Sequence, residues 1–161
     1  MTKNKQKSIK LDHFTFIEVV KNSPLVSIDL IVRNAQNEVL LGLRNNEPAK
    51  NYWFTFGGRI YKNERIAQAF QRIVQEEIGI DVDVKDAQFV GVFEHLYEEN
   101  FAQEPGFGTH CVVLAYEVRL LEPLRGLPTV QHHEYRWFRV EDLLQAQDVH
   151  PYTKAYFQEV N

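Results

Sequence analysis

The sequence predicts a single α+β domain, and three observations carry that prediction. Segments rich in β-branched and Leu residues lie on both sides of one strongly amphipathic helical segment. The chain has 161 residues, enough for one domain with a real core and short for two. No repeat, low-complexity segment or linker divides it. We therefore expect residues 11–161 to form one domain and the basic residues 1–10 to form a flexible N-terminal tail.

Composition and charge narrow the class of protein. With 44% hydrophobic and 25% charged residues, the chain has the balance of a soluble globular protein. A formal net charge of −4 argues against nucleic acid as a partner, because duplex affinity rests mainly on neutralising phosphates. The single cysteine, Cys111, excludes an intrachain disulfide and fits a reducing cytoplasm. No apolar run follows the basic start, so we expect no signal peptide, no membrane partner and a cytoplasmic location.

The first third of the chain predicts a helix followed by strands. Residues 11–22 place apolar side chains at helical spacing after a candidate N-cap at Asp12, although their alternation is also partly strand-like. Residues 25–34 and 38–45 predict two strands of a hairpin joined by a polar turn. Residues 51–58, NYWFTFGG, predict a core strand.

The central segment, residues 57–80, is a glycine pair, a short loop and a helix. At about 100° per residue its apolar side chains form one broad stripe, with Glu77 in the middle and Glu76 at the edge. A charge there is costly unless it is paired or binds a cation. The two acids and the glycine turn therefore suggest a site for a hard metal ion of the magnesium kind. The alternative is a side chain that reaches solvent from the last helical turn.

The rest of the chain continues the α+β pattern. The predicted strands are 87–100, 109–122 and 134–140, with polar loops at 100–108 and 122–133. Two helices are predicted at the end, at 141–147 and at 151–160, and Pro151 suits the first turn of the second.

Four polar residues in the strand regions are candidates for substrate contact. Arg44 ends a predicted strand and Arg59 follows the glycine pair, so together they can clamp a diphosphate through charge-assisted, bidentate hydrogen bonds. Asp29 and His95 lie within predicted strands, where a lone Asp is more often on the solvated face and a His is more often satisfied within the sheet than a ligand. If the sheet floors a pocket, Asp29 faces the substrate.

The loop before Trp137 carries Gln131, His132 and His133. Adjacent loop histidines are usually exposed and without function. Histidine is nevertheless the natural general base near neutral pH, and a Gln oxygen is an acceptable ligand for a hard metal ion.

The central segment resembles the Nudix box, G-x5-E-x7-R-E-U-x-E-E-x-G-U, in which U is a bulky apolar residue. The positions that match, at every interval, are Gly58, Glu64, Arg72, Glu76, Glu77, Gly79 and Ile80. One position departs, because Ile73 stands where the pattern has Glu. In ordinary Nudix enzymes that acid helps to hold the metals that assist attack at phosphorus, so its replacement disfavours such a mechanism. The resemblance implies the Nudix fold, a mixed β-sheet packed between helices.

Other segments resemble the GDP-mannose mannosyl hydrolase branch of that family. They are PLVS at 24–27, LLG-x-R at 40–44, YWF-x-x-GGR at 52–59 and QH-x-x-YRW at 131–137. The resemblance runs from about residue 12 to the C-terminus. It implies hydrolysis of GDP-mannose, or of GDP-glucose, to GDP and free sugar by inverting attack of water on the anomeric carbon. It also implies one Mg²⁺ or Mn²⁺ per subunit and a homodimer.

The resemblance also implies roles for individual residues. The implied metal ligands are the carbonyl of Gly58, Glu77 and Gln131, and the implied general base is His132. Arg44 and Arg59 would neutralise the leaving diphosphate during catalysis. Asp29 and His95 would line the sugar and phosphate site, with Asp29 also counted among the catalytic residues. Glu64, Arg72 and Glu76 would orient the box. Cys111 stands where the branch has an aromatic hydroxyl near a phosphate.

Two rival functions remain open at this point. One is a conventional Nudix pyrophosphohydrolase that cleaves a nucleoside diphosphate derivative or a triphosphate at phosphorus. The other is a catalytically silent Nudix module that only binds nucleotide sugars, and the acid missing at Ile73 is the feature that favours it.

Overall fold

A seven-stranded mixed sheet organises the domain in the computed structural model, which describes residues 9–128 and 132–158. The strands are β1 (Leu25–Arg33), β2 (Val39–Arg44), β3 (Trp53–Phe54), β4 (Phe56–Arg59), β5 (Gln88–Tyr97), β6 (Thr109–Arg119) and β7 (His132–Phe138). The helices are α1 (His13–Asn22), α2 (Ile66–Ile78), α3 (Val140–Gln145) and α4 (Pro151–Ala155), with a short 3-10 helix η1 (Val84–Asp86). The predicted α+β class with a mixed sheet between helices is confirmed.

The sheet places β1 at its centre. The main path is β3-β2-β1-β6-β5, with β4 paired to β1 and β7 paired to β2. β1 and β6 are parallel, and the other strand pairs are antiparallel. A parallel pair needs a long crossover, and here the chain between β1 and β6 contains α2. As a result, Asp29 of β1 lies between Gly57 of β4 and Ala115 of β6.

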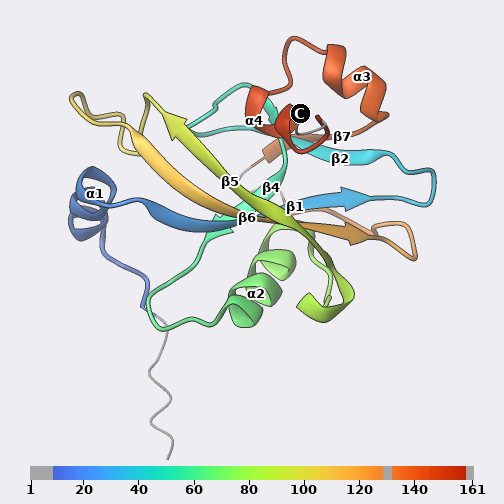
Figure 1. Ribbon diagram of the computed structural model, residues 1–161, viewed down its shortest axis with the longest axis horizontal. Coiled ribbons are helices and arrows are strands. Elements are labelled where there is room, and N and C mark those ends of the chain that lie inside the picture. Colours follow the sequence, from blue (N-terminus) through green and yellow to red (C-terminus); the bar gives the residue numbers. More distant parts are fainter. Residues whose placement is uncertain (1–8, 129–131, 159–161) are drawn as a thin grey trace, which may run out of the picture.

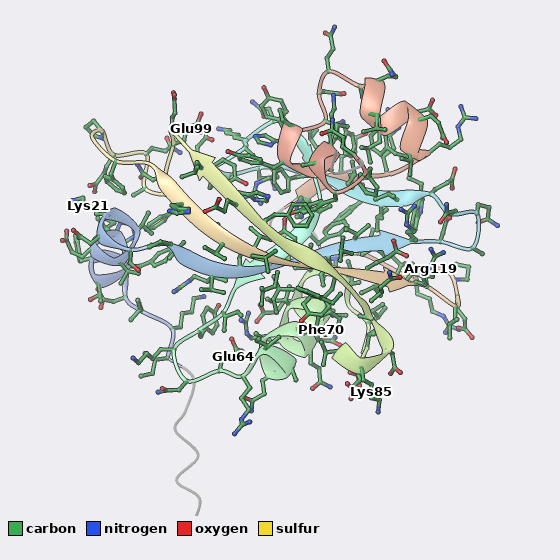
Figure 2. The ribbon with its side chains drawn as sticks, in the orientation of Figure 1. Lys21, Glu64, Phe70, Lys85, Glu99 and Arg119 are labelled. Atoms are coloured by element: carbon green, nitrogen blue, oxygen red, sulfur yellow. The ribbon has the colours of Figure 1, made fainter. Side chains whose placement is uncertain are left out.

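Helices cover both faces of the sheet. Figure 1 shows α2 on one side, and α3 and α4 on the other. The buried stripe of α2 packs on the first face, where Phe70 lies between helix and sheet (Figure 2). The helix ends at Gly79, whose φ of 71° is a left-handed conformation that favours glycine. A second apolar cluster, which includes Leu143 of α3, closes the other face.

The predicted N-terminal helix and its N-cap at Asp12 are confirmed. The helix begins at His13, and the Asp12 carboxylate caps it by accepting a hydrogen bond from the Thr15 N–H at 3.1 Å. Most of the predicted tail, residues 1–8, lies outside the described residues. Ile9 forms a bridge with Lys62. None of the helices in the described part is long and apolar enough to span a membrane.

Two strand predictions needed correction. The first hairpin pairs only near its turn, at Val32 with Leu40 and Arg33 with Val39, because β1 then pairs with β4. The single strand predicted at 51–58 is two short strands divided at Thr55. The Thr55 backbone N–H donates to the Thr153 hydroxyl instead of continuing the ladder, so β3 pairs with β2 while β4 pairs with β1.

The last elements also differ in extent. β7 begins at His132, so this histidine opens a strand instead of lying in the predicted loop. The two C-terminal helices exist, but α4 ends at Ala155, earlier than predicted. Pro151 lies in its first turn, as expected.

Candidate active site

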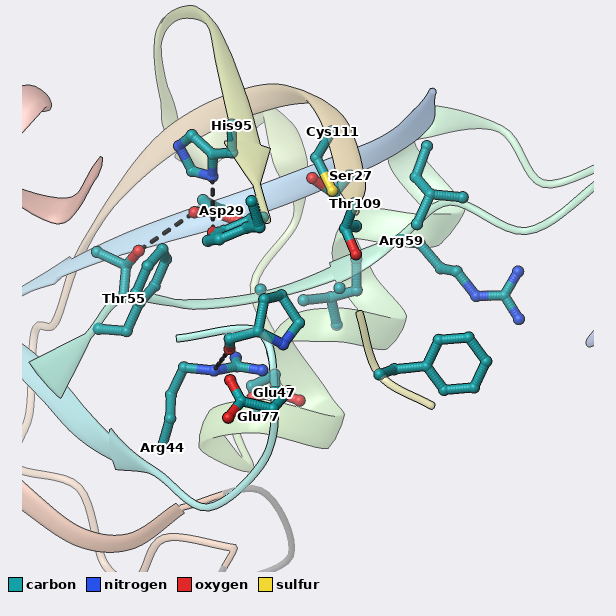
Figure 3. Close-up of a pocket in the computed structure, with 18 of the residues that line it drawn as sticks. Ser27, Asp29, Arg44, Glu47, Thr55, Arg59, Glu77, His95, Thr109 and Cys111 are labelled. Atoms are coloured by element: carbon teal, nitrogen blue, oxygen red, sulfur yellow. Dashed lines mark hydrogen bonds between the residues drawn. The ribbon is translucent and has the colours of Figure 1, made fainter. Parts of the chain in front are cut away.

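A cavity of about 360 Å³ opens between the sheet and the C-terminal part of α2. It brings together most of the predicted site residues, namely Asp29, Arg44, Gly58, Arg59, Glu77 and His95. Figure 3 shows Arg44, Glu47 and Glu77 on one side of the cavity and Asp29 and His95 on the other. His132 lines an adjoining cavity that it shares with Glu76 and Glu77. Glu77 thus faces both spaces.

Glu77 is a buried carboxylate on the apolar stripe of α2. Glu77 is only 6% exposed. This burial raises the pKa of its carboxyl to about 7, although the positive charge of Arg44 lowers that pKa. Removing an ionised carboxylate from water is costly, and a bound cation offsets this cost. The environment of Glu77 therefore fits a metal ligand.

The structure describes one of the two remaining predicted metal ligands, Gly58, and not the other, Gln131. Gly58 lines the same cavity as Glu77, and an added Cβ there would lie 3.2 Å from Ile73 Cγ1. Gln131 lies outside the described residues. The described residues contain no group of three or more His, Cys, Asp and Glu side chains placed to hold a metal ion. The predicted ligand set needs only one such side chain, Glu77, whose burial suits a hard cation.

Arg72 braces the loop that precedes α2. Its guanidinium donates to both carboxylate oxygens of Glu64, at 2.7 and 2.8 Å, and to the backbone carbonyl of Arg59 at 3.0 Å. It also donates to Glu76 at 3.1 Å. Glu64 in turn accepts from the Tyr61 backbone N–H at 2.9 Å. These bonds fix the chain from β4 into α2.

Arg44 and Arg59 reach the cavity from different strands. The Arg44 Nε–H donates to the Pro48 carbonyl at 2.9 Å, which fixes the guanidinium group. The Arg59 guanidinium lies 3.9 Å above the centre of the Phe16 ring, and its burial lowers its pKa. Two fixed guanidinium groups at one cavity suit a diphosphate.

Asp29 belongs to a polar network that sequence reasoning missed. Its carboxylate accepts hydrogen bonds from the Tyr156 hydroxyl at 2.6 Å and the Thr55 hydroxyl at 3.3 Å. The Tyr156 oxygen also lies 3.2 Å from His95 Nε2, and the Tyr97 hydroxyl lies 3.2 Å from His95 Nδ1. Burial raises the pKa of Asp29 to about 6 and lowers that of His95 to about 4. A tyrosine on the buried side of the C-terminal helix was the available signal, since a buried hydroxyl needs a partner.

His132 is buried, contrary to the exposure usual for loop histidines. It is 2% exposed, and its ring packs against Phe56 and Tyr135. Gly42 makes room for it, because an added Cβ there would lie 2.4 Å from the imidazole. His132 Nδ1 lies 4.0 Å from Glu77 Oε2.

Cys111 also lines the cavity. It lies opposite His95 in the β5–β6 pair, and burial raises the pKa of its thiol to about 11. A neutral thiol at this position is a weak hydrogen-bond donor.

Solved structures with the same fold include three Nudix proteins. A MutT NUDIX hydrolase from Burkholderia pseudomallei is 21% identical, with a TM-score of 0.69, over 87% of this chain and all of that one. A MutT protein from Methanosarcina mazei is 20% identical, with a TM-score of 0.66, over 84% and 92% of the chains. The NUDIX domain of NrtR from Shewanella oneidensis, solved with ADP ribose, is 14% identical, with a TM-score of 0.62, over 91% and 97%.

Similarity at the sequence level identifies the family as well as the fold. The low-salt glycan biosynthesis protein Agl8 of Haloferax volcanii is 37% identical over 139 residues, which are 86% of this chain and 83% of that protein. The family model described as the NUDIX domain matches residues 23–159. This match covers every candidate residue described above, and the chain therefore belongs to the NUDIX domain family.

Proposed function

We propose that this protein hydrolyses GDP-mannose, or GDP-glucose, to GDP and free sugar by inverting attack of water on the anomeric carbon. The observation that carries the proposal is that α2 supplies a single buried carboxylate, Glu77. At the position of the box acid, Ile73 is 1% exposed and packs in the apolar core. Glu76 is paired with Arg72. Such a site suits a single cation bound to a leaving group better than it suits several metal ions arranged around phosphorus.

The charges around the cavity match this reaction. Breaking the bond between the sugar and the diphosphate builds positive charge on the sugar and negative charge on the leaving group. Arg44 and Arg59 bind and orient the diphosphate. Glu77, the Gly58 carbonyl and Gln131 would hold a magnesium or manganese ion, which would supply further positive charge for the leaving group.

His132 is the proposed general base. An inverting displacement needs a base that activates water on the face opposite the leaving group. His132 Nδ1 lies 4.0 Å from Glu77 Oε2, and His132 lines the cavity that adjoins the one with Arg44 and Arg59. The Haloferax relative is named a glycan biosynthesis protein, and a sugar-containing substrate agrees with that name.

Hydrolysis in oxygen-18 water tests the proposal. We expect the label in the free sugar, with inverted configuration, and unlabelled GDP. Label in a nucleotide phosphate would instead identify a conventional Nudix pyrophosphohydrolase. Binding of GDP-mannose in magnesium without turnover would identify a silent binding module. A product assay across GDP-mannose, GDP-glucose and GDP-fucose then ranks the sugars.

We also propose that the protein is a homodimer in the cytoplasm. In the described part of the chain β5 pairs only with β6, and Phe89, Val92 and Leu96 on it are exposed. Exposed apolar side chains on an edge strand favour association. Light scattering with size-exclusion chromatography measures the mass, and a monomer at micromolar concentration would rule the dimer out.

A further inference from the structure

A chain of hydrogen bonds runs along the cavity wall from Tyr97 to Asp29. Its links are Tyr97 Oη to His95 Nδ1 at 3.2 Å, His95 Nε2 to Tyr156 Oη at 3.2 Å, and Tyr156 Oη to Asp29 Oδ2 at 2.6 Å. Asp29, His95 and Tyr156 are buried, and Tyr97 is partly buried and lines the cavity. Because water has little access, the partners of each polar atom come from the protein or from a ligand.

The positions of the protons in this hydrogen-bond chain follow from the short bond between Tyr156 and Asp29. Tyr156 has one proton and donates it to the Asp29 carboxylate, so its oxygen can only accept from His95. His95 must therefore carry its proton on Nε2. Burial lowers the pKa of His95 to about 4, so the ring is neutral at pH 7 and Nδ1 has only a lone pair. The Tyr97 hydroxyl consequently donates to Nδ1.

A second tyrosine of the C-terminal helix holds the imidazole in place. The Tyr152 ring is stacked on His95, with centres 4.3 Å apart and planes 7° from parallel. Its hydroxyl donates to the Leu96 carbonyl at 2.7 Å and accepts from the Leu96 N–H at 2.9 Å. The ring of Tyr152 thus fixes the plane of His95, while its hydroxyl takes no part in the chain that ends at Asp29.

We infer that Tyr97 is a specificity-determining residue whose hydroxyl oxygen accepts a hydrogen bond from a hydroxyl group of the sugar. Tyr156 is the positioning residue that fixes the direction of the hydrogen-bond chain. The inference rests on the proposed function. With its only proton committed to His95, the Tyr97 oxygen offers lone pairs to the cavity. A phosphate oxygen, which is an acceptor, does not suit this wall, whereas Arg44 and Arg59 are donors. The substrate is therefore oriented with its sugar toward Tyr97 and its diphosphate toward the arginines.

The tautomer of His95 tests the direction of the hydrogen-bond chain without any substrate. In 15N-labelled protein at pH 8, long-range 1H–15N correlation spectra should show His95 protonated on Nε2. Tyr156→Phe removes the acceptor and should give a mixture of tautomers or the Nδ1–H form. Tyr152→Phe, within α4, is the matched control and should leave the tautomer unchanged. An Nδ1–H ring in the wild type would overturn the inference even if every variant failed to fold.

Deoxyfluoro analogues of GDP-mannose test the contact with the sugar. Fluorine cannot donate a hydrogen bond, so at one sugar position the analogue should raise KM of the wild type by about 10-fold. Tyr97→Phe should remove this discrimination, and Tyr156→Phe should weaken it because Tyr97 can then turn its proton toward the cavity. If GDP-mannose is hydrolysed but no position shows discrimination that depends on Tyr97, this inference fails alone. If it is not hydrolysed at all, the proposed function fails and the sugar contact fails with it, while the tautomer still reports the direction of the chain.

Discussion

Glu77 Oε2 and His132 Nδ1 lie 4.0 Å apart, and both side chains are buried. One comes from the last turn of α2 and the other from the first residue of β7, so the contact depends on the fold bringing the central box beside a distant strand. A carboxylate that would hold the cation and an imidazole that would activate water are thereby kept as neighbours. The pair is the natural starting point for mutagenesis.

His132→Gln should lower kcat by about 100-fold or more, which is the contribution expected of a general base. The substitution keeps a polar side chain of similar size in the space beside Gly42. Magnesium should still raise the thermal unfolding temperature as it does in the wild type, because Glu77 is intact. An unchanged kcat would remove His132 from the mechanism.

Glu77→Gln should abolish the thermal stabilisation by magnesium, since binding to the folded state is what stabilises it. The raised pKa of Glu77, about 7, adds a pH dependence in the wild type. Magnesium must displace a proton from the carboxyl below this pKa, so binding should be tighter at pH 8 than at pH 6. Calorimetry in two buffers of different ionisation enthalpy measures the proton release, and its absence at pH 6 would count against Glu77 as a ligand.

Asp29 and His95 should make opposite contributions to the pH dependence of stability. The folded pKa of Asp29 is raised from 3.8 to about 6, so its stabilising protonation is lost as pH rises through 6. The folded pKa of His95 is lowered from 6.5 to about 4, so its contribution is present above pH 6.5 and lost as pH falls toward 4. Between pH 4 and 6 the two largely cancel in the wild type.

Single variants separate these contributions in urea titrations across that pH range. Relative to the wild type, Asp29→Asn should gain unfolding free energy from pH 4 to pH 6, by at most about 3 kcal/mol. His95→Gln should lose a similar amount over the same range. Parallel pH profiles for both variants and the wild type would show that neither group titrates as described.

Arg72→Lys should loosen the loop between β4 and α2. An ammonium group cannot reproduce the two parallel hydrogen bonds to Glu64 together with the bond to the Arg59 carbonyl. We expect faster amide hydrogen exchange over residues 59–64 and a fall in kcat/KM of about 10-fold or more through misplaced ligands. Arg139→Lys is the matched control, because Arg139 also contacts both oxygens of one carboxylate, that of Asp142, at an exposed position. Equal exchange in the two variants would contradict the bracing role.

Ile73→Glu should destabilise the protein, because the side chain packs in the α2 core beside Gly58. We expect a loss of about 3 kcal/mol in the free energy of unfolding for a charge without a partner there. Ile73→Val, which only removes a methylene group, should cost about 1 kcal/mol. Urea unfolding without metal compares them, and a Glu variant as stable as the Val variant would show that this position is not part of the core.

Features that depend on local periodicity could be predicted from the sequence. The position of Glu77 within an apolar stripe follows from the helical repeat alone, and the structure buries this residue as expected. The sequence was insufficient where a contact joins distant segments. Tyr156 and Asp29 are 127 positions apart, and no spacing rule links them. The burial of His132 depends on the register between β2 and β7, which pairs His132 with Arg44 while its ring lies against Gly42. That register cannot be read from either strand alone.

The C-terminal helix has a consequence for biosynthesis. α4 and the residue that follows it supply Tyr152 and Tyr156, which hold His95 and Asp29 of strands made much earlier. A ribosome-bound nascent chain that has not reached Tyr156 lacks the hydrogen-bond partner that Tyr156 offers to Asp29 and His95. The hydrogen bonds that hold Asp29 and His95 in place are therefore complete only after residue 156 has left the exit tunnel.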